Sequence, residues 1–374
     1  MFGQYEISGK SAVHDHDICL FNGRMRPVTE AHVGVIVEGL EHAQYVFVTV
    51  GSVNEPINFR NPFTFEQVYA MLRASLTPMQ NDRVFIFGIE DQQSDMAWVR
   101  TVQKTVATQA ARLFPDREAK IALIGHAKDA SSYYLKLFPK WASIAATVKH
   151  KGLDATTLRN DLYRAADPTE YVRKIHADVP CIPIGPYLFL REWVHSSDFE
   201  QMRAEYLFMA EYLDLFERNP FTGERQQFPT SDMVVKQAGY TLLVRRDRMP
   251  GEGLWAVPGG HKLAKQTFRG AALDEVGQET GIYDLNEDID REFMNLCIRG
   301  EKMFDDPWRS TRETTFSMSH GALLPGTRQP IVKGADDARE ARWWADDEIT
   351  RSMMFEDHFN QVQYWADQFR NIVI

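Results

Sequence analysis

A threonine and a histidine stand at the start of an amphipathic helical pattern that follows a short apolar run. Thr29 and His32 are three residues apart, so in a helix over 29–43 they share one face of the first turn. The free N–H groups and the positive dipole end of that turn favour an anion. Gly23 lets backbone amides approach a ligand closely, and Arg24 adds positive charge. These residues predict a phosphate site.

This corner of the chain has two interpretations. In the first, Thr29, His32 and the charges of Arg24 and Arg26 face a phosphate. In the second it is an ordinary strand–turn–helix corner, in which Thr29 caps the helix and His32 lies at the surface.

A second pair of chemically suited residues lies far along the chain. Glu275 and Glu279 are four apart within a helical pattern over 267–280, so they share one helix face. Two carboxylates on one face repel unless a cation lies between them, and Mg²⁺ or Mn²⁺ shared with substrate phosphates suits that arrangement. The alternative is a solvated acidic helix.

The elements that position the first pair alternate between strand and helix patterns. Such alternation predicts a doubly wound parallel sheet with helices on both faces. Strands are predicted at 17–21, 45–51, 83–89 and 120–125, and helices at 29–43, 64–76 and 96–112.

The pattern changes in the second half of the chain. A helical stretch, as one helix or two, is predicted at 190–219, and from Met233 onward strand-like runs predominate. We therefore predict a first domain over 1–190, a helical connector over 191–224 and a second domain over 225–374.

Composition limits the classes of protein that fit. The 374 residues are 44% hydrophobic and 25% charged, which suits a globular enzyme of two or three domains. The net charge of −10 disfavours nucleic acid and anionic membranes as partners. Three scattered cysteines and no signal-like or membrane-spanning apolar run favour the cytoplasm. Homo-oligomer formation stays open.

The first corner resembles the nucleotidylyltransferase signature G-R-F-x-P-x-H-x-G-H. Gly23, Arg24, Pro27 and His32 match it, while Thr29 replaces the first histidine. The stretch "LDATTLR" (153–159) resembles a second motif of this superfamily, I-S-S-T-x-I-R. That likeness places Thr156 and Arg159 on a triphosphate.

Three further stretches are similar to nicotinamide mononucleotide (NMN) adenylyltransferases of the bacterial two-domain type. They are 60–73, 90–103 and 124–141, and the last is the most specific. The resemblance implies Trp98 near the nicotinamide ring and a set of nucleotide-binding residues: Arg60, Gly125, Lys128 and Asp129.

This resemblance implies a reaction without a covalent intermediate. The NMN phosphate attacks the α-phosphorus of ATP in line, and pyrophosphate leaves with NAD as product. Thr29, His32 and Arg159 are the predicted catalytic residues, and Mg²⁺ is expected to come bound to the triphosphate.

The second helix resembles the Nudix box, G-x5-E-x7-R-E-U-x-E-E-x-G-U, where U is aliphatic. The spacing holds without a gap at Gly260, Glu275, Val276, Glu279, Gly281 and Ile282. Gln266, Asp274 and Gln278 depart from it. The resemblance implies a metal held by Glu275 and Glu279, and hydrolysis of ADP-ribose that the departures could weaken. In the two-domain family, the segment 305–315 holds ADP-ribose, which suggests Arg309 and Arg312 as diphosphate ligands.

Nearly the whole chain thus resembles the bifunctional NMN adenylyltransferase/Nudix hydrolase. The implied fold is a Rossmann-like sheet domain followed by an α/β/α Nudix domain with a mixed sheet. Three alternatives stay open: another phosphorylated acceptor such as phosphopantetheine, a Nudix domain that senses ADP-ribose without cutting it, and a different nucleoside diphosphate substrate.

Overall fold

The chain folds into two compact units that do not follow a single cut in the sequence. In the computed structural model, described for residues 14–92, 94–125, 135–147, 152–215, 218–307, 309–312, 315–370 and 372, the first unit ends at Ser196. A short stretch, Asn54–Pro62, belongs instead to the second unit with the chain from Ser197 onward. The predicted connector over 191–224 therefore contains the end of one unit and a helix of the other.

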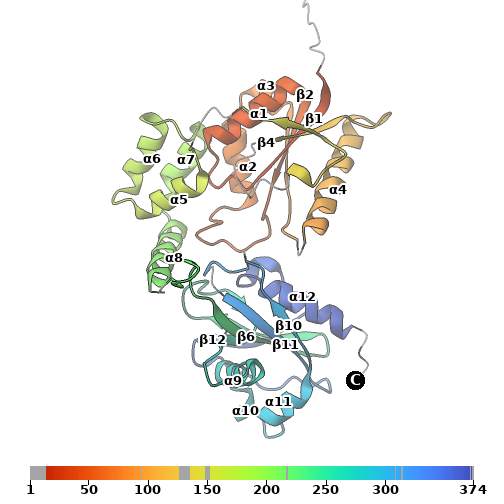
Figure 1. The fold of residues 1–374 in the computed structure, drawn as a ribbon, viewed down its shortest axis with the longest axis vertical. Coiled ribbons are helices and arrows are strands. Elements are labelled where there is room, and N and C mark those ends of the chain that lie inside the picture. The colour runs from red at the N-terminus through yellow and green to blue at the C-terminus, as the bar shows by residue number, and fades with distance from the viewer. Residues whose placement is uncertain are drawn as a thin grey trace, which may run out of the picture. The chain divides into compact units, whose positions relative to one another are not determined.

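The first unit is built on a parallel sheet with the strand order β3-β2-β1-β4-β5 (Figure 1). Its strands are β1 (His16–Gly23), β2 (Ala43–Val50), β3 (Val84–Gly88), β4 (Ile121–Gly125) and β5 (Ala142–Ala145). Its helices are α1 (Glu30–His42), α2 (Phe65–Ala74), α3 (Pro78–Asn81), α4 (Asp95–Leu113), α5 (Ala155–Arg164), α6 (Pro168–Ala177) and α7 (Ile184–Trp193).

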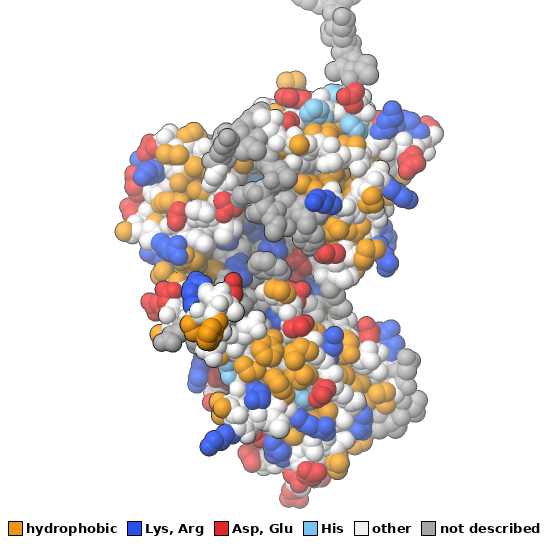
Figure 2. Space-filling view, in the orientation of Figure 1, with side chains coloured by type: hydrophobic (Ala, Val, Ile, Leu, Met, Phe, Trp, Pro, Cys, Tyr) orange, Lys and Arg blue, Asp and Glu red, His pale blue; other side chains and the backbone are white. Residues whose placement is uncertain are grey.

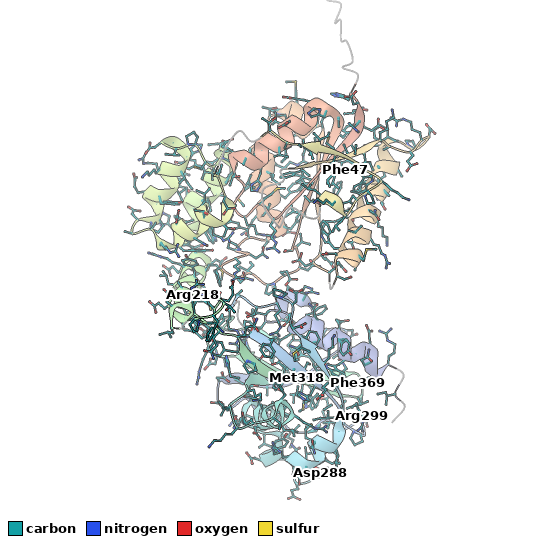
Figure 3. The ribbon with its side chains drawn as sticks, viewed as in Figure 1. Phe47, Arg218, Asp288, Arg299, Met318 and Phe369 are labelled. Carbon is teal, nitrogen blue, oxygen red and sulfur yellow. The ribbon has the colours of Figure 1, made fainter. Side chains whose placement is uncertain are left out.

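Alternate residues of the central strands serve the two faces of this sheet. Ile18 and Leu20 of β1 and Phe47 of β2 pack with the apolar stripe of α4 (Figure 3). Cys19 and Val46, which point the other way, lie under α1 at Gly39. The order of the strands reverses between β1 and β4. In open α/β sheets, ligands bind beyond the carboxyl ends of the strands at such a point.

The second unit is a mixed sheet between helices. β11 pairs β6 in parallel, and the remaining pairings are antiparallel, in the order β10-β11-β6-β7-β12 with β8 on β7 and β9 on β6. The strands are β6 (Phe228–Gln237), β7 (Tyr240–Arg246), β8 (Trp255–Ala256), β9 (Gly259–His261), β10 (Ile298–Phe304), β11 (Thr315–Leu323) and β12 (Ala338–Ala345). The helices are α8 (Ser197–Asp214), α9 (Phe268–Thr280), α10 (Ile282–Leu285), α11 (Arg291–Cys297) and α12 (His358–Phe369), with a 3₁₀ turn at Arg351–Met353.

Neighbouring residues of β6 show how the second sheet is covered. Met233 and Val235 pack with α9 and α11, whereas Val234 packs against Trp365 and Phe369 of α12 (Figure 3). The layers are therefore helix, sheet and helix, which confirms the predicted fold class for this half as the parallel sheet does for the first.

The surface carries charges of both signs. Acidic and basic side chains are interspersed over the visible face of each unit, without a broad basic field on that face (Figure 2). Among the described helices, none has the length and apolarity to cross a membrane.

Candidate active sites

The start of α1 is closed by a reciprocal pair of hydrogen bonds. The Thr29 backbone N–H donates to His32 Nδ1 at 3.0 Å, and the His32 backbone N–H donates to Thr29 Oγ1 at 3.4 Å. Thr29 is thus the N-cap and is buried, whereas His32 is half-buried. Because Nδ1 accepts from an amide, the neutral ring carries its proton on Nε2. The capping interpretation and the phosphate interpretation are compatible, since the cap uses Nδ1 and the backbone N–H of His32 and not Nε2.

The loop between β1 and α1 is held from within by Arg26. Its guanidinium donates to three backbone carbonyls: Phe63 at 3.0 Å, Gly51 at 2.9 Å and Ser52 at 3.3 Å. Burial, together with the nearby charge of Arg24, lowers the pKa of Arg26 to about 10. The charge of Arg26 therefore organises the loop, and of the two arginines only Arg24 is exposed.

The second motif meets the first on this same loop. Arg159, buried on α5, donates from Nη1 to the Arg26 carbonyl at 2.7 Å. Asp154, which stands where a motif serine is usual, caps α5 by accepting from the Thr157 N–H at 3.0 Å, and Thr156 is exposed in the first turn. The start of α5 is thereby fixed to the loop that leads into α1.

A cleft of about 430 Å³ opens beside the start of α5. Asp154 and Thr157 line it together with Cys181, whose carbonyl accepts from the backbone N–H of Glu30, the first residue of α1, at 2.9 Å. Helix N-termini favour an anion through their dipoles, and α5 is joined by Arg159 to the loop that leads into α1, so the region suits a nucleotide phosphate.

The predicted acceptor residues are only partly described. Trp98 lies half-buried on α4, edge-on to Phe138 with ring centroids 5.7 Å apart. Gly125 ends β4, on the same sheet edge as Gly23 at the end of β1. Lys128 and Asp129 lie outside the described residues.

The two glutamates of α9 lie against β9, the short strand that precedes the helix. Glu279 accepts from the Gly259 N–H at 2.9 Å and is 6% exposed. A Cβ on Gly260 would lie 2.2 Å from Glu275 Oε1, so a larger residue there would displace this carboxylate. The spacing predicts both carboxylates on one helix face, and in the structure both lie at the adjacent residues Gly259 and Gly260.

Both carboxylates are electrostatically strained in the bare protein. Burial raises the pKa of Glu275 to about 7, with Asp337 and Asp336 adding to the rise. Burial also raises the pKa of Glu279 well above its ordinary value, and Glu275 adds repulsion. A cation would relieve these costs and release the protons.

The donor set fits an ion shared with substrate. Among the described residues, no three carboxylate, histidine or cysteine side chains form a cluster that could hold a metal. Mg²⁺ commonly binds through one or two carboxylates plus substrate phosphates, which matches a pair such as Glu275 and Glu279.

Two of the three departures from the Nudix box compensate each other. Gln266 Nε2 donates to Asp274 Oδ2 at 3.0 Å, and Arg291 of α11 donates to Asp274 Oδ1 at 2.8 Å. Asp274 is thus held by its own partners and is not a third ligand beside Glu275. Gln278 is exposed.

The two predicted diphosphate arginines are engaged inside the protein. Arg309 makes a bidentate pair with Asp357 at 2.7 and 2.9 Å, and Arg312 pairs with Glu356 at 3.2 Å. Glu356 also accepts from the Ser310 hydroxyl and from the amide and hydroxyl of Thr311. The binding roles of Arg309 and Arg312 stay predictions. Their acidic partners, Asp357 and Glu356, lie 48 and 44 positions further along the chain, and no sequence motif paired them.

Arg60 also lies in this second network. Its Nη2 donates to the Thr311 carbonyl at 2.9 Å, and Phe59 beside it packs edge-on against Tyr206 of α8. Glu55, in the same stretch, pairs with Arg351 at 3.1 Å. Sequence reasoning assigned Arg60 to the NMN-binding half, whereas the structure places its contacts in the second unit.

Fold and sites together define a nucleotidyl-transfer unit followed by a unit whose helix α9 carries two clustered carboxylates. A cytidylyltransferase-like family model matches residues 20–202, and a NUDIX domain model matches 228–364. The chain therefore contains a cytidylyltransferase-like domain and a NUDIX domain.

Individual proteins similar to this chain fall in the same two classes. A nicotinamide/nicotinic acid mononucleotide adenylyltransferase of Acinetobacter baylyi is 29% identical over 194 residues, which are 52% of this chain and 95% of the relative. A bifunctional NMN adenylyltransferase/ADP ribose pyrophosphatase of Francisella tularensis, complexed with AMP and a manganese ion, superposes with a TM-score of 0.79. That match has 27% identity and covers 94% of this chain and 99% of the other. A second structure of the same protein gives 28% identity at the same TM-score and coverage.

Proposed function

We propose that this protein makes NAD from NMN and ATP in its first domain and splits ADP-ribose into AMP and ribose 5-phosphate in its second. The observation that carries the proposal is the likeness, over 94% of the chain, to a structure that bears both names. The local geometry of each site supports the corresponding half.

The first reaction needs two phosphates to be held in line. The capping box fixes the ring of His32, whose Nε2–H is the proposed donor to phosphate oxygens, and the start of α5 offers amides and the hydroxyl of Thr156. Arg159 positions the loop before α1 through its hydrogen bond to the Arg26 carbonyl. The chain itself supplies positioning and charge stabilisation, with no covalent intermediate.

The second reaction uses a divalent ion, Mg²⁺ or Mn²⁺. Glu275 and Glu279 would hold it, and the ion would polarise the diphosphate and its attacking water. The Gly259 N–H fixes Glu279, and Gly260 leaves room for Glu275. Because burial raises the pKa of both carboxylates, metal binding competes with protons.

We place both reactions in the cytoplasm, with small nucleotides as partners. All three cysteines, each within the described residues, are free. The net charge of −10 argues against nucleic acid as a partner.

The test of the first half is an acceptor series with the full chain. ATP is supplied with NMN, nicotinate mononucleotide or phosphopantetheine, and pyrophosphate release is measured. We expect turnover with NMN and none with phosphopantetheine. The reverse preference would replace the proposed acceptor.

The test of the second half separates enzyme from sensor. AMP release from ADP-ribose is followed during Mg²⁺ and Mn²⁺ titrations, with EDTA as the control, and ADP-ribose binding is measured by calorimetry. We expect metal-dependent release. Binding without release at any metal concentration would leave a sensing domain.

A further inference from the structure

Arg246, at the end of β7, is held rigidly by neutral groups. Its Nε donates to the Pro250 carbonyl at 2.9 Å, and its guanidinium carbon lies 4.1 Å from the centre of the Phe355 ring. Stacking on an aromatic face together with one fixed N–H sets the direction of the remaining guanidinium nitrogens.

The loop that anchors Arg246 is itself closely packed. Gly251 has a φ of +74°, and a Cβ there would lie 2.2 Å from the Phe355 ring. Its N–H donates to the buried Glu205 of α8 at 3.0 Å. The Pro250 carbonyl and the Phe355 ring, with Gly251 fixed between them, thus hold the half-buried guanidinium of Arg246 in one position; these three residues are called its seat.

That seat does not supply an anion. Within the described part of the chain, Nη1 and Nη2 of Arg246 have no hydrogen-bond partner, whereas the neighbouring Arg312 is paired with Glu356. Arg312 lies over the same ring, 5.5 Å from its centre, so two cations flank Phe355. A desolvated guanidinium without its own anion costs free energy, which a bound anion would recover.

The seat adjoins the carboxylates of the second site. The backbone N–H of Asp247, the next residue, donates to the Asp337 carbonyl at 3.0 Å. Burial and the charge of Arg312 lower the pKa of Arg246, whereas the carboxylates of Glu356, Glu279 and Asp337 act in the opposite direction. Asp337 in turn interacts with Glu279. An unpaired cation thus lies close to the pair that would hold the metal.

We propose that Arg246 is a ligand of the substrate diphosphate in the second domain, opposite the ion held by Glu275 and Glu279. The two unpaired nitrogens form a fork that matches two oxygens of one phosphate. This inference rests on the proposed hydrolase function. It gives the diphosphate a binding residue besides Arg309 and Arg312, whose guanidiniums are engaged with Asp357 and Glu356.

The experiment compares Arg246→Lys and Arg246→Ala with Arg245→Ala in the full chain. Arg245 is the matched control because it is the adjacent strand residue, is also half-buried and also donates to a backbone carbonyl, that of Gly253 at 3.1 Å. ADP-ribose binding is measured by calorimetry in EDTA, and KM and kcat for AMP release are measured with Mg²⁺. NAD synthesis by the same samples checks concentration and folding.

We expect Arg246→Ala to weaken metal-free ADP-ribose binding and to raise KM by about tenfold or more, the usual loss for a hydrogen-bonded charge. Arg246→Lys keeps a point charge but not the fork, so it should fall between Arg246→Ala and wild type. Arg245→Ala should bind as wild type does. If both Arg246 variants bind ADP-ribose as well as Arg245→Ala, the inference is wrong.

Failure of the hydrolase proposal gives a different pattern. Wild type would then release no AMP. A loss of ADP-ribose binding in the Arg246 variants alone would still support Arg246 as a diphosphate ligand. Absence of ADP-ribose binding by wild type would overturn both proposals.

Discussion

The two sites carry opposite kinds of groups: the first gathers hydrogen-bond donors, and the second gathers carboxylates. At the start of α1, donors are gathered and held by neutral groups: three carbonyls accept from Arg26, and the Thr29 amide donates to Nδ1 of His32. On α9, acceptors are gathered, and Glu279 is held by one amide, from Gly259. The first site is organised for an anion before one arrives, whereas the second is strained until a cation arrives.

This difference separates the ways in which the sites fail. Loss of a donor in the first domain should lower catalysis without changing how the protein responds to pH or metal. Loss of a carboxylate in the second should change both, because proton and metal compete for the same oxygens.

The largest effect should come from Glu279→Gln. One carboxylate would be left to hold the ion, so AMP release should fall by at least about 1,000-fold, as several kcal/mol of metal-derived stabilisation are lost. AMP release is measured at saturating Mg²⁺, with exposed Glu292→Gln as the control. If the variant keeps a tenth of the wild-type rate, Glu279 is not a metal ligand. Gln278→Glu, which adds a carboxylate next to it, should lower the Mg²⁺ requirement.

His32→Ala should have the next largest effect on activity. Loss of the Nε2–H donor should lower kcat for NAD synthesis by about 100-fold, the usual effect of one donor to a developing charge. His42→Ala, in the last turn of the same helix, is the matched control. If the His32 variant folds and keeps more than half of the activity, the anion site lies elsewhere.

Trp98→Ala should have a smaller and more selective effect. Stacking of an aromatic ring on nicotinamide contributes about 1 kcal/mol, so KM for NMN should rise about fivefold while KM for ATP stays near wild type. Trp141→Ala is the control, because Trp141 stacks on the same Phe138 at 4.7 Å. Equal changes in the two variants, or in the two KM values, would make Trp98 a packing residue.

The smallest predicted effect concerns stability in EDTA. The folded-state pKa of Glu275 is raised to about 7, so its stabilising contribution is present below its ordinary pKa of 4.5 and is lost as pH rises through 7. Glu275→Gln avoids that loss and should have a Tm a few degrees above wild type at pH 8 but not at pH 4.5. Mg²⁺ should raise the Tm of wild type more than that of the variant. A pH-independent difference would contradict the assignment of strain to this carboxylate.

The local patterns of the sequence predicted the elements that carry the motifs. Apolar runs and helical periodicity indicated β1 to β4, α1, α2, α4 and α9, each within a few residues of its bounds. The predicted helical stretch at 190–219 is two helices, α7 and α8, separated by a short turn. Not predicted were β5, α6, β10 and α11, which are short or weakly patterned.

Long-range partners could not be read from spacing. Arg60 meets Thr311 across 251 positions, and Arg309 meets Asp357 across 48. Asp274 was recognised as a departure from the Nudix box, but its partner Arg291 lies on another helix. A single sequence shows which residues could do chemistry, whereas only the fold shows which of them already have partners.

The most direct test of the two-site account is a crossed assay of His32→Ala and Glu279→Gln. NAD formation from NMN and ATP, and AMP release from ADP-ribose, are both measured on each variant and on wild type at saturating Mg²⁺. We predict that His32→Ala loses only NAD formation and that Glu279→Gln loses only AMP release. Loss of both activities in a folded single variant, or no AMP release by wild type, would contradict the account.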